Sequence, residues 1–423
     1  METAVVLRGG GNWHCAEALR GAILSCNAAI YSVKCAYMKA TATLKIKLEL
    51  TTEAAQSLLK TQAAYVVALN KTSEVAFAQH VFNSVALHHI TYKDVRALTG
   101  LPANLACSAR CIVAEAYKRD NSIQHKWKPT AAMRYDARTL TVKPEQGFAT
   151  LTTLDGRIRV SLILAEYHRQ YLNGSWEIEP TATVLRKGSV WYLHMIATKD
   201  IPDTEGDGVI GVDSGIVRVA TVSTGKVFKG GKIKQIRERR FKQRRSLQSA
   251  RHKSRAQRKL LQRLAGREKR AVDHLLWNVA NGIVDEALKV GASEIAFEDL
   301  KGIRSRVRWA KKQRLINHGW PFASLMQKTA HVGSKVGVRK VEVEAPGTSK
   351  TCNRCGHCDK ANRKSQSLFV CVQCLHKNNA DDNASLNIRD RRVLSRMRDV
   401  TTRSVSDFPK GQPFKSQGKA ACF

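Results

Sequence analysis

Four cysteines near the end of the chain constrain its fold more than any other feature. They form two Cys-x2-Cys motifs separated by fifteen residues, and they are Cys352, Cys355, Cys371 and Cys374. Thiolates at this spacing are typical of a tetrahedral Zn²⁺ site with Zn–S bonds of about 2.3 Å. A redox motif would explain one pair, but two pairs at this separation favour metal binding. The sequence therefore predicts one structural Zn²⁺ in a ribbon at residues 348–379, with no metal role for His357 or Cys358.

The charge balance points to a polyanionic partner. The 423 residues carry 71 Lys and Arg against 35 Asp and Glu, a net charge of +36. Each phosphate that such a surface neutralises releases counterions and adds affinity. A basic ribosomal or membrane-surface protein is the alternative, but the chain has no apolar span of about 18 residues and no isolated basic amphipathic helix. We therefore expect a nucleic acid, and no membrane, as the partner.

Hydrophobic content and the remaining cysteines indicate a globular cytoplasmic protein. With 43% hydrophobic residues the chain can form about two to four domains. Its first residues lack the basic and apolar regions of a secretory signal. Seven further cysteines show no disulfide spacing: Cys15, Cys26, Cys35, Cys107, Cys111, Cys358 and Cys422.

The first half of the chain predicts a strand followed by helices. TLKIKLEL, at 43–50, alternates apolar and charged residues as a half-buried strand does, and Thr51 offers an N-cap to the helix after it. Helical spacing then covers residues 53–119, broken at 98–102 by Gly and Pro. This region is expected to be a small helical insert.

Residues 131–200 change to short β-rich runs. Asp155-Gly156 and Lys187-Gly188 stand between such runs and predict two-residue hairpin turns. The runs predict an antiparallel barrel or sheet that also takes in the strand before the helices. The expected divisions are a barrel at 38–52 and 120–205, the helical insert at 53–119, and a segment of unclear role at 1–37.

The second half of the chain predicts an α/β domain. After a polar linker at 201–208, three meandering strands precede alternating helices and strands, which is the order of the ribonuclease-H-like fold. The fold class is thus α+β and multidomain: a β-barrel with a helical insert, then a ribonuclease-H-like α/β domain with an inserted four-cysteine zinc ribbon. The second domain is assigned to 206–347 and 380–396, and 397–423 is expected to be a disordered tail.

Three carboxylates could meet in this second domain. Asp213 lies in the apolar strand VIGVD and Glu298 ends the apolar strand IAFE, so each is costly to bury without a cation. If these strands are neighbours, a helix opening at Asp381 adds a third acid. Such a cluster can hold two Mg²⁺ or Mn²⁺ ions about 3.5–4 Å apart for phosphodiester hydrolysis. Each acid alone would be a helix cap or a solvated strand end, but the set in this order favours a catalytic site.

A basic arm follows the first three strands. Residues 232–270 hold seventeen Lys or Arg and two Glu, with a sparse apolar side that predicts a docked helix. A solvated charge run is the usual alternative, yet the charge is too one-sided for salt-bridged solubility, so contact with a sugar-phosphate backbone is favoured. The candidates are Arg237, Arg239, Arg240, Lys242, Arg244, Arg245, Arg251 and Lys253. A second basic loop, 301–314, follows Glu298 and could cover a catalytic cleft.

Several of these stretches together resemble the transposon-encoded TnpB proteins and the compact type V CRISPR-associated nucleases. The matching motifs are VIGVDSGI, IAFEDLKGIR, TSKTCNRCGH, FVCVQC and NADDNASLNI, in the family's order over about 43–395. The resemblance implies an RNA-guided DNA endonuclease of prokaryotes. A wedge barrel with a recognition insert would bind guide RNA and a short motif beside the target, and a RuvC-like domain would cut double-stranded target DNA.

The resemblance also implies roles for single residues. Asp213, Glu298 and Asp381 become the magnesium-binding catalytic triad, and the four cysteines become zinc ligands. Two positions depart from the family: Leu375 stands where Gly usually follows the fourth cysteine, and Asp381-Asp382 stand where one acid is usual. Counting back from the next Asn-Ala pair favours Asp381 as the third acid, and Asp382 remains the alternative.

Two other functions stay open at this point. One is an RNA-guided DNA-binding protein with little or no cleavage. The other is an unguided RuvC-type nuclease or resolvase, which would not need the regions at 38–200. The sequence does not distinguish a monomer from a homodimer, or a transposon protein from a CRISPR effector.

Overall fold

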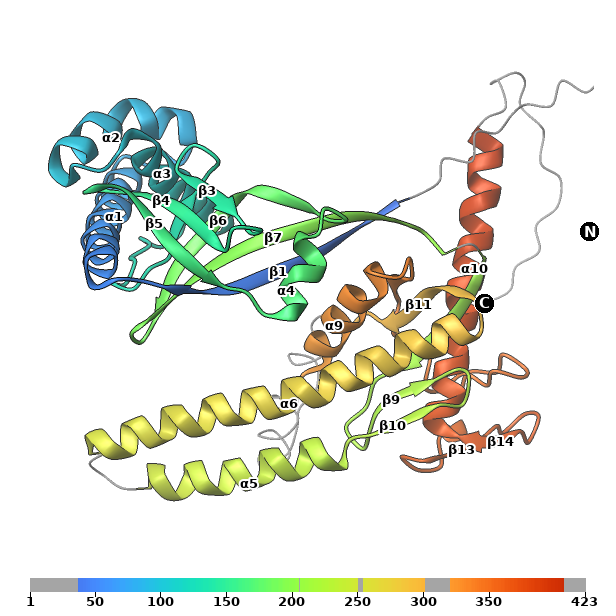
Figure 1. The fold of residues 1–423 in the computed structure, drawn as a ribbon. Helices are drawn as coiled ribbons and strands as arrows, with labels where there is room; N and C mark the ends of the chain where they lie inside the picture. Colours follow the sequence, from blue (N-terminus) through green and yellow to red (C-terminus); the bar gives the residue numbers. More distant parts are fainter. Residues whose placement is uncertain (1–36, 205, 250–253, 301–319, 407–423) are drawn as a thin grey trace, which may run out of the picture. The chain divides into compact units, whose positions relative to one another are not determined.

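The computed structural model describes residues 37–204, 206–249, 254–300 and 320–406, and for residues 399–406 only the backbone (Figure 1). The segment of unclear role, the basic loop at 301–314, and the candidates Arg251 and Lys253 lie outside the described residues. Within the described ranges the chain forms a seven-stranded sheet, a five-stranded sheet and a small two-stranded sheet in the cysteine-rich ribbon.

The first sheet is built around the long strand β1 (Tyr37–Glu49). Its burial alternates strictly from Ala40 to Leu48, as the period-two pattern predicts. β1 pairs along most of its length with β7 (Val190–Pro202) and at its end with β5 (Gly156–Ile163). All pairs are antiparallel, in the order β2-β6-β7-β1-β5-β4-β3. The other strands are β2 (Met133–Tyr135), β3 (Leu140–Lys143), β4 (Phe148–Thr153) and β6 (Glu177–Lys187).

Short turns bring this sheet close to a barrel. The predicted hairpins are present, but their two-residue loops are Leu154-Asp155 and Gly188-Ser189, one residue from the expected pairs. In the first hairpin Gly156, with a φ of 101°, is already paired in β5, and in the second hairpin Gly188, with a φ of 63°, is the first loop residue. The two edge strands, β2 and β3, are joined by the four-residue turn 136–139, where the Asp136 carboxylate accepts from the amides of the next turn residues. The sheet is therefore nearly closed.

Three helices come after β1 and pack on this sheet: α1 (Thr52–Ala78), α2 (Ser84–Thr99) and α3 (Ala103–Arg119). Thr51 caps α1 by accepting from the Ala54 amide at 3.2 Å. Gly100, with φ of 64°, ends α2, and Pro102 precedes α3, so the break predicted at 98–102 is confirmed. Apolar residues of these helices share one core with the sheet. Figure 1 shows them gathered at one end of it.

The second sheet has five strands in the order β10-β9-β8-β11-β12. They are β8 (Gly208–Asp213), β9 (Arg218–Val222), β10 (Val227–Lys229), β11 (Ala292–Glu298) and β12 (Arg339–Val343). The first three form an antiparallel meander, and β11 lies parallel to both β8 and β12. The strands that carry Asp213 and Glu298, β8 and β11, are thus neighbours.

Helices cover this sheet and complete its core. They are α5 (Gly231–Gln248), α6 (Arg255–Lys289), α9 (Phe322–Ser334) and α10 (Ala380–Ser406). α6 packs against α5 and α9, and its apolar side joins the core with β8 and β11. α10 packs against β8 so closely that a Cβ at Gly211 would collide with the main chain of Ser385 and Arg389. Only glycine permits this approach.

The expected tail needs a correction. We expected disorder from 397 onward, but α10 continues to Ser406. The Ser- and Thr-rich composition misled the sequence prediction, because these residues do not end a helix in the way Gly or Pro would, and none of the latter occurs between Ala380 and Ser406. Residues 407–423 lie outside the described residues.

Candidate functional site

Two of the predicted acids stand at the carboxyl ends of neighbouring parallel strands. Val212 of β8 is paired with Phe297 of β11, and Asp213 and Glu298 are the next residue of each strand. Because parallel strands end at the same edge of a sheet, both carboxylates belong to one edge. Both side chains are half-buried. Thr348, which is 2% exposed, donates a hydrogen bond from its Oγ1 to the Glu298 carboxylate.

The third predicted acid comes from the first turn of α10. The Asp381 amide donates to the Asn379 side chain at 3.0 Å, which fixes the start of the helix. The close contact at Gly211 then sets α10 against the strand that carries Asp213. An acid in the first turn is also favoured by the helix dipole. The structure thus places β11 and the helix that carries Asp381 against the strand that carries Asp213.

The electrostatics indicate that these acids interact. Burial, together with the negative charges of Glu298 and Asp381, raises the pKa of Asp213 to about 8. Burial also raises the pKa of Glu298 and of Asp381 above their ordinary values. Among the acids of α10, Asp381 is the one whose charge is a main cause of the raised pKa of Asp213.

Two arginines that sequence reasoning missed lie beside Asp381. The Arg218 Nε is 3.8 Å from one of its oxygens, and the Arg363 Nη2 is 3.9 Å from the other. Arg363 belongs to the ribbon, and its charge also lowers the pKa of both Asp213 and Glu298. Nothing in the sequence pattern marked either arginine, because their positions depend on tertiary packing. Thr348 was at least within a quoted motif, TSKTCNRCGH.

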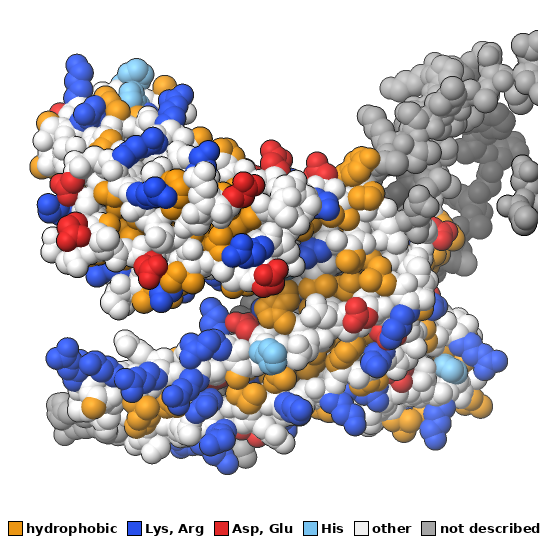
Figure 2. Space-filling model, in the orientation of Figure 1, with side chains coloured by type: hydrophobic (Ala, Val, Ile, Leu, Met, Phe, Trp, Pro, Cys, Tyr) orange, Lys and Arg blue, Asp and Glu red, His pale blue; other side chains and the backbone are white. Residues whose placement is uncertain are grey.

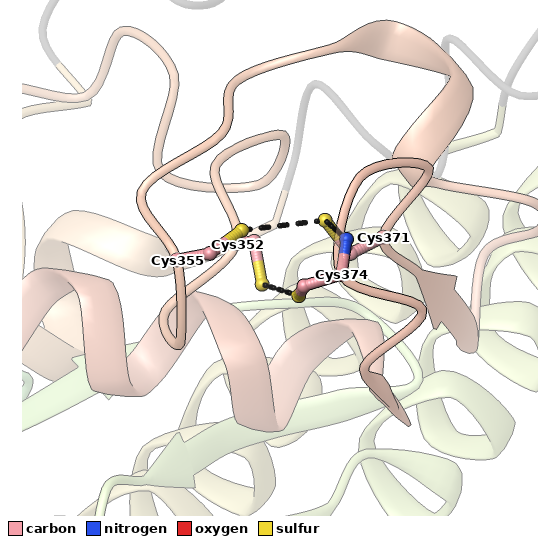
Figure 3. Close-up of side chains that lie close together, drawn as sticks. All are labelled: Cys352, Cys355, Cys371 and Cys374. Atoms are coloured by element: carbon pink, nitrogen blue, oxygen red, sulfur yellow. Dashed lines mark hydrogen bonds between the residues drawn. The ribbon is translucent and has the colours of Figure 1, made fainter.

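The four predicted cysteines come together as one cluster (Figure 3). Their sulfurs all lie within 4.8 Å of one another. The Sγ atoms of Cys352 and Cys374 are 3.7 Å apart, and those of Cys355 and Cys371 are 3.6 Å apart. A tetrahedron with metal–sulfur bonds of ~2.3 Å has edges of about 3.8 Å, so the cluster has the size of a tetrahedral thiolate site.

The chemistry of the cluster also fits a metal site. Burial alone would raise the pKa of Cys371, but the backbone amides of Cys374 and Gln373 and the thiols of Cys355 and Cys374 lower it to about 6. The neighbouring thiols raise the pKa of Cys355 to about 12, so the negative charge of the cluster is placed on Cys371. A thiolate is the form that binds metal. Across the described part of the chain, this is the one group of three or more His, Cys, Asp or Glu close enough to hold a metal ion, so the three acids are not gathered as tightly. His357 and Cys358 are not part of this group.

Asparagine side chains connect the ribbon to α10. Asn383 and Asn387 each donate from Nδ2 to the Thr351 carbonyl, at 2.8 and 2.7 Å, and Asn387 also donates to the Thr348 carbonyl. The ribbon itself holds a two-stranded sheet, β13 (Leu368–Val370) and β14 (Lys377–Asn379). The cysteine cluster, Thr348 and the start of α10 therefore form one connected unit.

Leu375, the position that departs from the resembling family, has an unusual backbone. Its φ is 54°, in the left-handed region that a side chain with a Cβ rarely adopts. Its amide donates to the Cys371 carbonyl at 3.1 Å, which closes the turn around the second cysteine pair. The side chain is 75% exposed and packs on little. Glycine is the residue that this turn accommodates without strain.

The basic arm consists of α5 and the first turns of α6, which pack together. Figure 2 shows Lys and Arg side chains along the surface over these two helices. Arg244 forms an ion pair with Glu268, and the Arg237 guanidinium lies 6.0 Å from the centre of the Trp320 ring. These two arginines thus help to hold the arm in place. The exposed candidates among the described residues are Arg239, Lys242 and Arg245.

No helix within the described ranges has the length and apolarity needed to cross a membrane.

Comparisons with known proteins agree with these observations. Residues 193–304 match the OrfB_IS605 family model, described as a probable transposase, and residues 322–388 match the Cas12f1-like TNB domain model. A CRISPR-associated endodeoxyribonuclease Cas12f1 of Syntrophomonas palmitatica is 28% identical over 200 residues, which cover 44% of this chain and 39% of that protein.

Two further relatives have names other than Cas12f1. The putative RNA-guided DNA endonuclease InsQ of Escherichia coli is 25% identical over 49% of this chain and 55% of its own length. A TnpB-like protein of Methanocaldococcus jannaschii is 26% identical over 51% of this chain and 80% of its own length. The chain thus spans about two fifths of the Cas12f1 relative and just over half of InsQ.

A solved structure shares the fold. The cryo-EM structure of a Cas12f1–sgRNA–target DNA complex superposes with a TM-score of 0.61 at 16% identity, over 81% of this chain and 84% of that one. Both family models, the relatives and this fold point to the same group, which includes OrfB-type transposon proteins and Cas12f1. Over these regions the chain is similar to the TnpB and compact type V CRISPR-associated proteins.

Proposed function

We propose that this protein is an RNA-guided DNA endonuclease that hydrolyses phosphodiester bonds at Asp213, Glu298 and Asp381. The observation that carries the proposal is that burial and the charges of Glu298 on β11 and Asp381 on α10 raise the pKa of Asp213 on β8 to about 8. The order of the second sheet, three meandering strands with parallel strands added beside the first, supports a RuvC-like domain. The names of the relatives supply the guide RNA and the DNA target.

The three acids are suited to hold Mg²⁺ or Mn²⁺. Carboxylate oxygens are hard donors, which Mg²⁺ and Mn²⁺ prefer. Burial and like-charged neighbours make Asp213 harder to ionise, and a divalent ion would supply the positive charge that favours its ionised form. When bound, two such ions supply charge stabilisation at the attacking and leaving oxygens of a phosphodiester. The other contributions come from the chain. Thr348 fixes the orientation of Glu298, and Arg363 adds a positive charge beside Asp381.

We propose Zn²⁺ as the ion of the cysteine cluster, in a structural role. Four sulfurs close a tetrahedral site and leave no open position for a substrate. The bonds from Asn383 and Asn387 to the ribbon main chain then transmit that stability to the helix that carries Asp381. In this scheme the ribbon spans 348–379 within a nuclease domain at 206–347 and 380–396.

The remaining regions would hold the nucleic acids. The nearly closed sheet at 38–52 and 120–205 is the candidate wedge domain, and the helices at 53–119 are the candidate recognition insert. Arg239, Lys242 and Arg245 are the exposed side chains of the basic arm that we assign to backbone phosphates.

The test begins with RNA that co-purifies with the protein when it is expressed with its native flanking DNA. A single RNA with a constant scaffold and a variable end supports guidance. Target DNA matching that variable end is then offered in Mg²⁺ to the wild-type complex and to the Asp213→Asn complex. Cleavage by the wild type alone supports the proposal. Binding without cleavage by either would indicate a guided binding protein, and cleavage without RNA would indicate an unguided nuclease.

A further inference from the structure

The two adjacent acids at the start of α10 have different partners. The Oδ1 atom of Asp382 accepts a hydrogen bond from Arg218 Nη1 at 2.9 Å. The nearest arginine nitrogens to Asp381 are 3.8 and 3.9 Å away, beyond hydrogen-bonding distance. Asp382 is therefore engaged by a guanidinium, while the Asp381 carboxylate has no such direct bond to Arg218 or Arg363.

Arg218 starts from a fixed point on the sheet. It opens β9 and is paired with Lys229 of β10. A Cβ at Gly215 would lie 2.7 Å from the Arg218 carbonyl oxygen, so the turn between β8 and β9 is packed tightly against the main chain of Arg218. The guanidinium thus reaches α10 from the first residue of β9, whose main chain is held by the neighbouring strand and by the turn after β8.

We propose that Arg218 and Asp382 form a positioning pair, which holds the first turn of α10 against β9 so that Asp381 is the acid presented to Asp213. The inference rests on the proposed function, because it assigns a role to residues beside the acid cluster. It explains the acid pair Asp381-Asp382: the second acid occupies Arg218, and this keeps the guanidinium from binding Asp381 directly.

The pair has an effect on cation binding whose sign can be stated for each variant. In Asp382→Asn the guanidinium loses its anionic partner and can close the short distance to Asp381, where it competes with a divalent ion. In Arg218→Gln that competing charge is absent. One unit charge at ~4 Å in water-like surroundings changes an equilibrium by about fivefold. We expect Asp382→Asn to weaken cation binding by at least this factor. Arg218→Gln should weaken it less, because it removes the positioning contact but leaves no competing charge beside Asp381.

The experiment measures Mn²⁺ binding to the full-length protein with its co-purified RNA, by titration with detection of free Mn²⁺ by electron paramagnetic resonance. Asp381→Asn is the matched control at the neighbouring position and should remove at least one ion. The double variant Arg218→Gln/Asp382→Asn should bind Mn²⁺ more tightly than Asp382→Asn, because the competing charge is gone, but less tightly than the wild type, because the positioning pair is absent. Loss of an ion in Asp382→Asn, as in Asp381→Asn, would make Asp382 a ligand and overturn the proposal, as would unchanged affinity in both single variants.

A second measurement separates this inference from the proposed function. Unfolding midpoints of the two single variants and the double variant are compared in EDTA, where cation binding plays no part. A double variant less destabilised than the sum of the singles supports the pair, and additive effects overturn it. If Asp213→Asn and Asp381→Asn both leave Mn²⁺ binding unchanged, the proposed metal site fails, and this unfolding cycle alone decides whether the pair exists.

Discussion

Replacing Asp213 by Asn should stabilise the metal-free protein, and the gain should grow with pH. In the folded wild type the pKa of this carboxyl is about 8, whereas in the unfolded chain it is near ~3.9. Between these values the folded state binds one more proton than the unfolded state, so the free energy of unfolding falls as pH rises. The slope is about 1.4 kcal/mol per pH unit.

The size of the effect can be worked out from that slope. From pH 5 to pH 7 the free energy of unfolding of the wild type should fall by at most about 2.7 kcal/mol because of this carboxyl. Asp213→Asn lacks the carboxyl and should not show this fall. This figure is an upper limit because the side chain is only half-buried, and about 1 kcal/mol would still be measurable. Asparagine has nearly the same shape and no charge, so the difference reports the carboxyl itself.

The assay is urea unfolding of both proteins in EDTA at pH 5, 6 and 7. Glu115→Gln is the control, because Glu115 is held by two hydrogen bonds from Arg134, which lower its pKa. Glu115→Gln should lower the free energy of unfolding by an amount that hardly changes between pH 5 and pH 7, since the Glu115 carboxyl is ionised in both the folded and the unfolded protein. Adding Mg²⁺ should narrow the gap between Asp213→Asn and the wild type. A gap that is equal at pH 5 and pH 7 would refute the reasoning.

Three further predictions concern the ribbon and the arm. Leu375→Gly should raise the free energy of unfolding by about 1 kcal/mol by relieving the left-handed backbone, while Leu375→Ala, which keeps a Cβ, should not. Cys352→Ser should release the metal and lower the unfolding midpoint, while Cys358→Ser should retain one zinc per chain by elemental analysis. Unchanged metal content in the first variant would contradict the site. Changing the three exposed arm residues to Gln should make the plot of log nucleic-acid affinity against log salt concentration less steep by about 2–3. The three are Arg239, Lys242 and Arg245. Arg244→Gln should leave that slope unchanged, because Arg244 is already paired with Glu268.

The parts of the fold that depend on local pattern were predictable. Three predictions with a short-range physical cause are confirmed: the alternating burial along β1, the end of a helix at Gly100, and the grouping of the four cysteines. The neighbouring of β8 and β11 could be predicted from the order of elements. The hairpin loops and the end of α10 were misplaced, because single residues near an element's end carry little information about where hydrogen bonding stops.

The surroundings of the acids were not predictable from one sequence. Arg218 and Arg363 are isolated basic residues in a chain with 71 Lys and Arg, and only tertiary packing brings them beside Asp381. Thr348 lay within a recognised motif, but its bond to Glu298 depends on how the ribbon joins the sheet. The left-handed backbone of Leu375 was foreshadowed only by the glycine usual in the family.

The way α10 holds the ribbon bears on how such proteins can diverge. The side chains of Asn383 and Asn387 bind main-chain atoms of residues 348–353 and no ribbon side chain, and Asn362 binds the carbonyls of Lys350 and His357 within the ribbon in the same manner. A joint made to the main chain tolerates exchange of the outward-facing side chains. The ribbon can therefore acquire new surface contacts by mutation while the helix that bears Asp381 keeps its place.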